Sequence, residues 1–85
     1  MTPAEITARI RNTLPDAEIE LAGADCHFEV TVVSQTLGSY SQLARQRMLL
    51  ALFSAELGSG VLHALSIRAH TPHEAAMRQA GGQPI

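Results

Sequence analysis

Two neighbouring segments, residues 17–22 and 26–34, alternate apolar with polar side chains and are separated only by Gly23-Ala24-Asp25. Alternation with a period of two is typical of a strand that buries one face, and a short turn between two such strands predicts an antiparallel hairpin. The apolar side of the second segment consists of Phe28, Val30 and Val32. Any fold of this chain must therefore cover one face of a hairpin and leave the other face polar.

Helices are expected on both sides of the hairpin. Thr2-Pro3-Ala4-Glu5 is a capping box with proline at the first helical position, and Pro15 should end the helix that it opens. A longer helix is expected from about 41 to 57, with Gly58 as its C-terminal cap. The first helix presents Ile6, Ile10 and Leu14 on one face, and the apolar stripe expected on the longer helix is Ala44, Met48, Ala51, Leu52 and Ala55.

The last third of the chain adds one strand and one helix. Residues 61–69 form an apolar run, and Thr71-Pro72-His73-Glu74 is a second capping box that opens a helix to about residue 80. A strand–helix–strand connection predicts parallel pairing of the second and third strands. The order α-β-β-α-β-α thus predicts an α+β fold, a three-stranded mixed sheet covered by helices on one face. We expect one domain over residues 1–80 and a flexible tail over 81–85.

The composition and charge of the chain argue against several classes of function. The chain has 85 residues, a net charge of −2, six arginines without any lysine, and one cysteine. This balance argues against tight binding to nucleic acid, and one cysteine cannot form an internal disulfide. There is no apolar run of membrane-spanning length, no signal peptide and no motif for nucleophilic or metalloprotease chemistry. We expect a cytoplasmic, non-enzymatic protein that does not associate with membranes.

Three residues are candidates for binding a metal: His63, Cys26 and His27. His63 lies near the start of an apolar strand; the residues alone favour a half-buried histidine bonded to a backbone carbonyl, with a ligand role as the alternative. Cys26 and His27 combine a thiol with an imidazole, which suits a transition metal or an iron–sulfur cluster. Adjacent strand residues point to opposite faces, so Cys26 and His27 are alternatives rather than a pair.

The longer helix carries two further candidate surfaces. Arg45 and Arg47 point to different faces and read as a solvated flank, or alternatively as contacts to nucleic acid. Leu49 and Phe53 lie off the expected apolar stripe. They are either an exposed surface for a partner or residues that the last helix covers.

These segments together resemble the BolA family. The resemblance rests on His27-Phe28-Glu29-Val30, on Gly38-x-x-Ser41 leading to Arg45-Gln46-Arg47, and on the run from Val61 to Ala69 followed by Thr71-Pro72-x-Glu74. It implies a fold similar to a class II KH domain without the GxxG loop. It also implies partnership with a monothiol glutaredoxin of the Cys-Gly-Phe-Ser type.

The resemblance further implies a [2Fe–2S] cluster shared with that glutaredoxin and its glutathione, in iron–sulfur cluster trafficking or iron regulation. The family's histidine in the third strand corresponds to His63, and its second ligand to Cys26 or His27. The isolated chain, a monomer or weak homodimer, is not expected to hold the cluster. Some family members are described as DNA-binding regulators of stress response and cell shape, which makes DNA the alternative partner, through Arg45 and Arg47.

Overall fold

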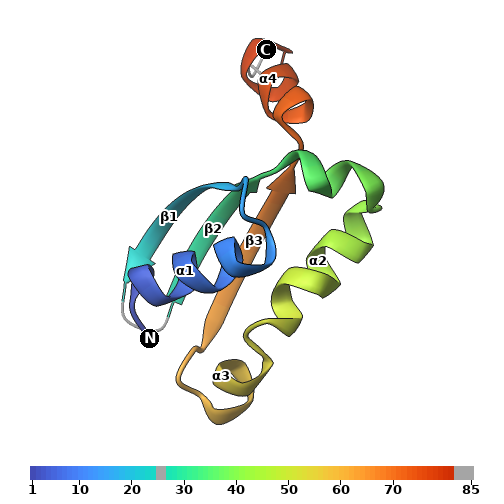
Figure 1. The fold of residues 1–85 in the computed structure, drawn as a ribbon. Coiled ribbons are helices and arrows are strands. Elements are labelled where there is room, and N and C mark those ends of the chain that lie inside the picture. Colours follow the sequence, from blue (N-terminus) through green and yellow to red (C-terminus); the bar gives the residue numbers. More distant parts are fainter. Residues whose placement is uncertain (25–26, 82–85) are drawn as a thin grey trace.

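The protein is described by a computed structural model that covers residues 1–24 and 27–81, without the side chains of 78–81. Its elements follow the expected order, with an extra 3₁₀ turn and one helix divided in two (Figure 1). They are α1 (Pro3–Thr13), β1 (Glu18–Ala24), β2 (His27–Val33), η1 (Gln35–Ser39), α2 (Gln42–Ala51), α3 (Ser54–Ser59), β3 (Ala64–His70) and α4 (Pro72–Gly81). Most of the predicted tail, residues 82–85, lies outside the described residues, as does Cys26.

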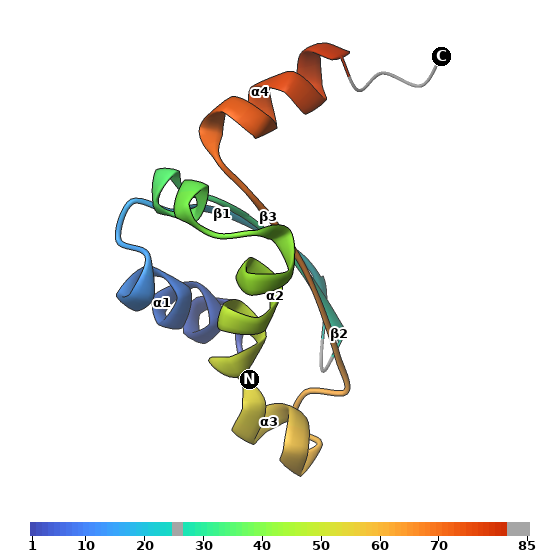
Figure 2. The same cartoon turned by 90° about the vertical axis from the view of Figure 1, so that its right-hand side faces the viewer.

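The three strands form one mixed sheet in the order β1-β2-β3. β1 and β2 are antiparallel, from Glu18 opposite Val33 to Ala24 opposite His27. β2 and β3 are parallel, from His27 opposite Ala64 to Val33 opposite His70. Figure 2 shows α1, α2 and α3 on one side of the sheet and nothing over the other side. The predicted fold is confirmed: an α+β arrangement with a mixed sheet whose helices cover one face.

The capping boxes form as expected. The Thr2 hydroxyl accepts from the Glu5 amide at 3.1 Å, and the Glu5 carboxylate accepts from the Thr2 amide at 2.9 Å. The corresponding distances between Thr71 and Glu74 are 3.2 and 3.0 Å. Each box satisfies amides that would otherwise lack a partner in a helix's first turn. α1 ends two residues before Pro15, because the residue that precedes a proline disfavours helical geometry.

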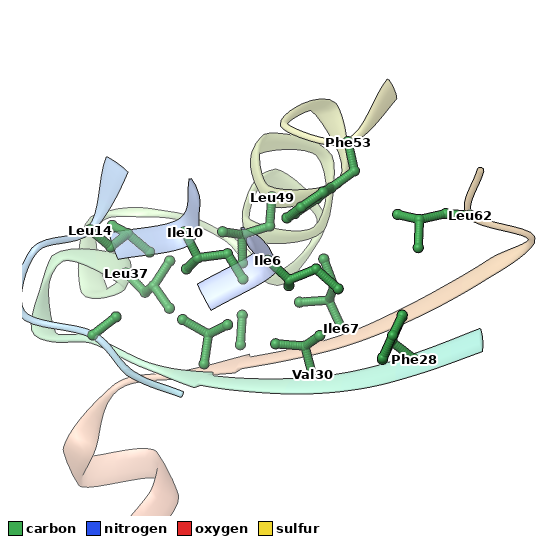
Figure 3. Packing of buried hydrophobic residues seen from close by; sticks show 13 residues of the cluster. Ile6, Ile10, Leu14, Phe28, Val30, Leu37, Leu49, Phe53, Leu62 and Ile67 are labelled. Carbon is green, nitrogen blue, oxygen red and sulfur yellow. The ribbon is translucent and has the colours of Figure 1, made fainter. Parts of the chain in front are cut away.

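The core lies between the helices and the inner face of the sheet (Figure 3). Its fully buried members include Leu49 and Phe53, both 0% exposed. The prediction that these two residues form a partner surface is therefore wrong. The buried face of α2 is Arg45 and Leu49, continued by Phe53, whereas Ala51 and Ala55 of the predicted stripe are exposed. Because the charged Arg45 lies on the buried face of α2, hydrophobicity alone does not identify that face.

The predicted helix from 41 to 57 is broken between α2 and α3. Phe53 takes a non-helical conformation (φ −118°, ψ 16°), which turns its ring into the core. Arg9 of α1 supports the break: its guanidinium lies 5.2 Å from the Phe53 ring centroid and donates to the Leu52 carbonyl at 3.0 Å. The left-handed cap of α3 is Gly60 (φ 86°), not Gly58 as predicted.

α4 does not lie against the sheet; it extends beyond the end of β3 (Figure 2). It therefore does not cover Leu49 and Phe53, which α1 and the sheet bury instead. Within the described residues no helix is long and apolar enough to span a bilayer.

Candidate metal-ligating site

Two histidines meet at one end of the sheet. His27 is the first residue of β2 and lies opposite Ala64, so His63 comes immediately before that register position. The two ring centroids are 5.7 Å apart and the ring planes meet at 84°, an edge-to-face arrangement. Both side chains are exposed. Two imidazoles from segments 36 positions apart thus share one solvent-facing site.

His63 lies just outside the strand. β3 begins at Ala64, and the strand residues that point into the core are Leu65, Ile67 and Ala69. The expected placement of His63 within the strand, beside the apolar layer, is wrong. The alternative of a half-buried core histidine is also excluded, because the side chain is exposed.

The approach to His63 is fixed from the core side. Leu62 is 1% exposed, and its amide donates to the Glu56 carbonyl at 3.0 Å. Gly60, in the left-handed region, ends α3 and turns the chain toward the sheet. Because Leu62 is buried while His63 is exposed, the histidine is held at the surface by an anchored neighbour.

His27 depends on a glycine on the facing strand. Gly23 has φ 106°, and a Cβ built on it would lie 2.2 Å from the His27 carbonyl oxygen. No side chain fits in that space, so β1 can approach the start of β2 this closely only with glycine at position 23. The sequence marked Gly23 as a turn residue; its contact with His27 became visible only with the strand register.

Cys26, the other candidate for the second ligand, lies outside the described residues, together with Asp25. Among the described residues no group of three or more histidine, cysteine, aspartate or glutamate side chains could hold a metal ion. His27 and His63 therefore supply two ligands at most. Further ligands must come from residues 25–26 or from another molecule.

The histidine pair has the chemistry that an iron–sulfur cluster needs. Two imidazoles that share an ion through nitrogen bonds of about 2.0–2.1 Å have centroids roughly 5 Å apart, close to the separation seen here. Histidine pairs ligate one of the two irons in Rieske-type [2Fe–2S] centres. The separation of the two rings fits two ligands to one iron.

The two candidate arginines differ in exposure. Arg47 is exposed. Arg45 is only 4% exposed and donates to the carbonyls of Leu37, Tyr40 and Ala69 and to Glu74. The expectation that Arg45 lies on a solvated flank is wrong, because these acceptors replace the water that a guanidinium would otherwise need.

The fold and the site define a small α+β protein with an exposed histidine pair beside a hairpin. The family described as BolA-like protein matches residues 6–74 of the chain. The protein belongs to the BolA-like family.

Individual relatives agree with this assignment. Human BolA-like protein 1 is 46% identical over 50 residues, 59% of this chain and 36% of that protein, so the match spans about a third of that relative's length. Acid stress protein IbaG from Escherichia coli is 29% identical over 70 residues, 82% of this chain and 83% of the relative. The structure of BolA1 from Arabidopsis thaliana superposes with a TM-score of 0.73 at 29% identity, covering 84% of this chain and 92% of that one. None of these names denotes an enzyme.

Proposed function

We propose that this protein is an accessory factor that binds a monothiol glutaredoxin of the Cys-Gly-Phe-Ser type and co-ligates a [2Fe–2S] cluster with it. His27 and His63 would ligate one iron through neutral imidazole nitrogens, with Cys26 as the alternative to His27. The glutaredoxin cysteine and glutathione would ligate the other iron. When bound, the cluster supplies a transferable iron–sulfur unit whose potential is raised by imidazole ligation.

The observation that carries this proposal is the ring contact between His27 and His63 at 5.7 Å. Because both side chains are exposed, a ligand from outside the molecule can reach the two rings together. With only two ligands between them, they favour a cluster completed by a partner over a metal held by this chain alone.

The test is reconstitution of the cluster with reduced glutaredoxin, glutathione, iron and sulfide, followed by visible absorption and circular dichroism. The variants are His63→Ala, His27→Asn and Cys26→Ser. His73→Ala is the matched control, because His73 is also exposed but lies in α4, beyond the opposite end of β3. Far-ultraviolet circular dichroism verifies that each variant is folded.

We expect His63→Ala and His27→Asn to change or abolish the spectrum of the shared cluster and His73→Ala to leave it unchanged. An effect of Cys26→Ser without an effect of His27→Asn would assign the second ligand to Cys26. An unaltered spectrum in folded His63→Ala protein would refute the proposal.

DNA binding through the arginines of α2 receives no support from the structure. Arg45 is bonded inside the protein, which leaves Arg47 as the one exposed cation of α2, in a chain of net charge −2. Affinity for DNA generally depends on several cations that contact phosphates together.

A further inference from the structure

The face of the sheet opposite the helices is uncovered (Figure 2). His27 belongs to this face, because it is exposed and alternates with the buried Phe28 and Val30 along β2. Cross-strand partners share a face, so the row that contains His27 also contains Ala24 of β1 and Ala64 of β3. The next row is Ala22, Glu29 and Ser66. Apart from Glu29, the side chains around His27 on this face are small, so another molecule can approach the sheet closely beside the histidine.

Farther from His27 the same face becomes acidic. Glu20 lies opposite Thr31, and Glu18 lies opposite Val33. Thr31 is four residues along β2 from His27, roughly 13 Å at the rise of a strand. A depression of about 230 Å³ opens here, lined on this face by Glu20, Ala22, Glu29, Thr31 and Arg68.

Glu18 and Glu20 have no structural task. Among the described residues the other carboxylates are engaged in helix capping, in hydrogen bonds to backbone or hydroxyl groups, or in ion pairs. Glu18 and Glu20 make no such interaction in the described part of the chain, and both are exposed. Even the neighbouring Glu29–Arg68 pair, 3.5 Å apart, has both side chains more than half exposed. The face therefore offers uncompensated negative charge.

The outer edge of β3 is less available than this face. The Gln46 amide of α2 donates to the Ile67 carbonyl at 2.5 Å, and Arg45 donates to the Ala69 carbonyl at 3.1 Å. Two carbonyls of that edge are thus already occupied, which disfavours the addition of a partner's strand there.

We propose that the uncovered sheet face is the docking surface for the cluster-sharing partner, which presents a basic contact surface to it. This inference rests on the proposed function. A lysine or arginine of the partner enters the depression beside Glu20, while the partner's own cluster ligands reach His27 and His63 at the end of the same face. Charge complementarity identifies the partner's chemistry, and the row of small residues sets the distance of approach.

The first test neutralises the charge. Glu18→Gln/Glu20→Gln is compared with Asn12→Lys/Ala51→Lys, which changes net charge by the same +2 at exposed positions on the helical side. The probe is a reduced monothiol glutaredoxin with basic residues around its active-site cysteine, titrated calorimetrically with glutathione present. In 0.1 M salt, charges more than about 10 Å apart are largely screened, so the lysines of the control variant should have little effect on a partner at the opposite face. We expect about fivefold weaker binding for the first variant and less than twofold change for the second.

The second test fills the depression without changing charge. Ala22→Trp is compared with Ala51→Trp, because both alanines are exposed and only Ala22 lines the depression. Tryptophan is tolerated in strands, so Ala22→Trp should fold. We expect it to abolish binding and the control to preserve it.

The proposed docking surface would be overturned if Ala22→Trp and Glu18→Gln/Glu20→Gln each bound glutaredoxin as tightly as their own control variants do. The proposed function would still stand if the cluster spectrum remained dependent on His63. If the native chain bound no glutaredoxin and formed no shared cluster, both proposals would fall.

Discussion

Arg45 binds Glu74 through both carboxylate oxygens, at 2.6 and 3.2 Å, and this pair joins α2 to the first turn of α4. The same guanidinium donates to carbonyls of η1 and β3, including Leu37 at 2.9 Å. Glu74 meanwhile closes the α4 capping box with Thr71. One buried cation therefore connects α2, η1, β3 and a helix that otherwise extends away from the body.

Replacement of Arg45 by Met should destabilise the protein. It removes donors from three carbonyls and leaves Glu74 without its cation, so we expect a loss of about 3 kcal/mol in the free energy of unfolding. Urea denaturation measures this loss. Arg47→Met, at an exposed position of the same helix, should change stability by no more than about 0.5 kcal/mol. Equal effects of the two variants would mean that the Arg45 bonds contribute nothing net.

The docking of α4 should weaken as the solution becomes acidic. The side-chain hydrogen bond from Arg45, followed by the Thr71 amide, lowers the pKa of Glu74 from 4.5 to about 2. Because the folded pKa is depressed, the stabilisation is complete above pH 4.5 and is lost as pH falls toward 2. The carboxyl carbon shift of Glu74, followed by NMR, should titrate near the lower value. In Arg45→Met protein the midpoint should move up toward 4.5; an unmoved midpoint would contradict this cause.

Phe53→Ala should affect folding rather than recognition of a partner. The ring is fully buried between α1 and the sheet, so its removal should cost about 3–5 kcal/mol, much of the stability of a domain this small. Leu43→Ala, which truncates a side chain 59% exposed on α2, should leave the thermal midpoint nearly unchanged. A folded, stable Phe53→Ala protein with weakened glutaredoxin binding would instead return Phe53 to the contact surface.

Local sequence signals predicted most of the fold because each acts over a few residues. The alternation in 26–34, the two Thr-Pro-x-Glu boxes and the apolar run before Thr71 all appear as the expected strands and helix starts. The predictions that failed depend on long-range contacts. Arg45 became a core residue because its acceptors come from η1, β3 and α4, and no window of α2 alone contains them.

The sequence predicts which residues belong to the site but not how these residues are arranged in space. His27 and His63 were both identified as candidates, but their contact follows from the register of β2 with β3, which places His27 opposite Ala64. The break at Phe53 was likewise hidden, because it is supported by Arg9 from α1, 44 positions away. The periodicity of the sequence locates the helices and strands, whereas the way in which these elements pair decides which side chains come into contact.

Gly23→Ala should separate the two histidines. A methyl group at this position would meet the His27 carbonyl at 2.2 Å while the backbone is held at φ 106°, so the start of β2 must move. We expect a loss of about 2 kcal/mol in stability, disappearance of the contacts between the His27 and His63 ring protons in NMR spectra, and weaker cluster assembly.

Variants of two other glycines, Gly58 in α3 and Gly60 at its end, distinguish the effect of backbone strain from the effect of displacing His27. Gly60→Ala carries the strain of a positive φ (86°) without a clash, and Gly58→Ala carries neither. We expect Gly60→Ala to lower stability while His27 stays in place, and Gly58→Ala to be neutral or slightly stabilising. If Gly23→Ala kept the ring contact and the native cluster spectrum, the close approach of β1 would not be what positions His27. If Gly60→Ala reproduced every effect of Gly23→Ala, backbone strain alone would explain them.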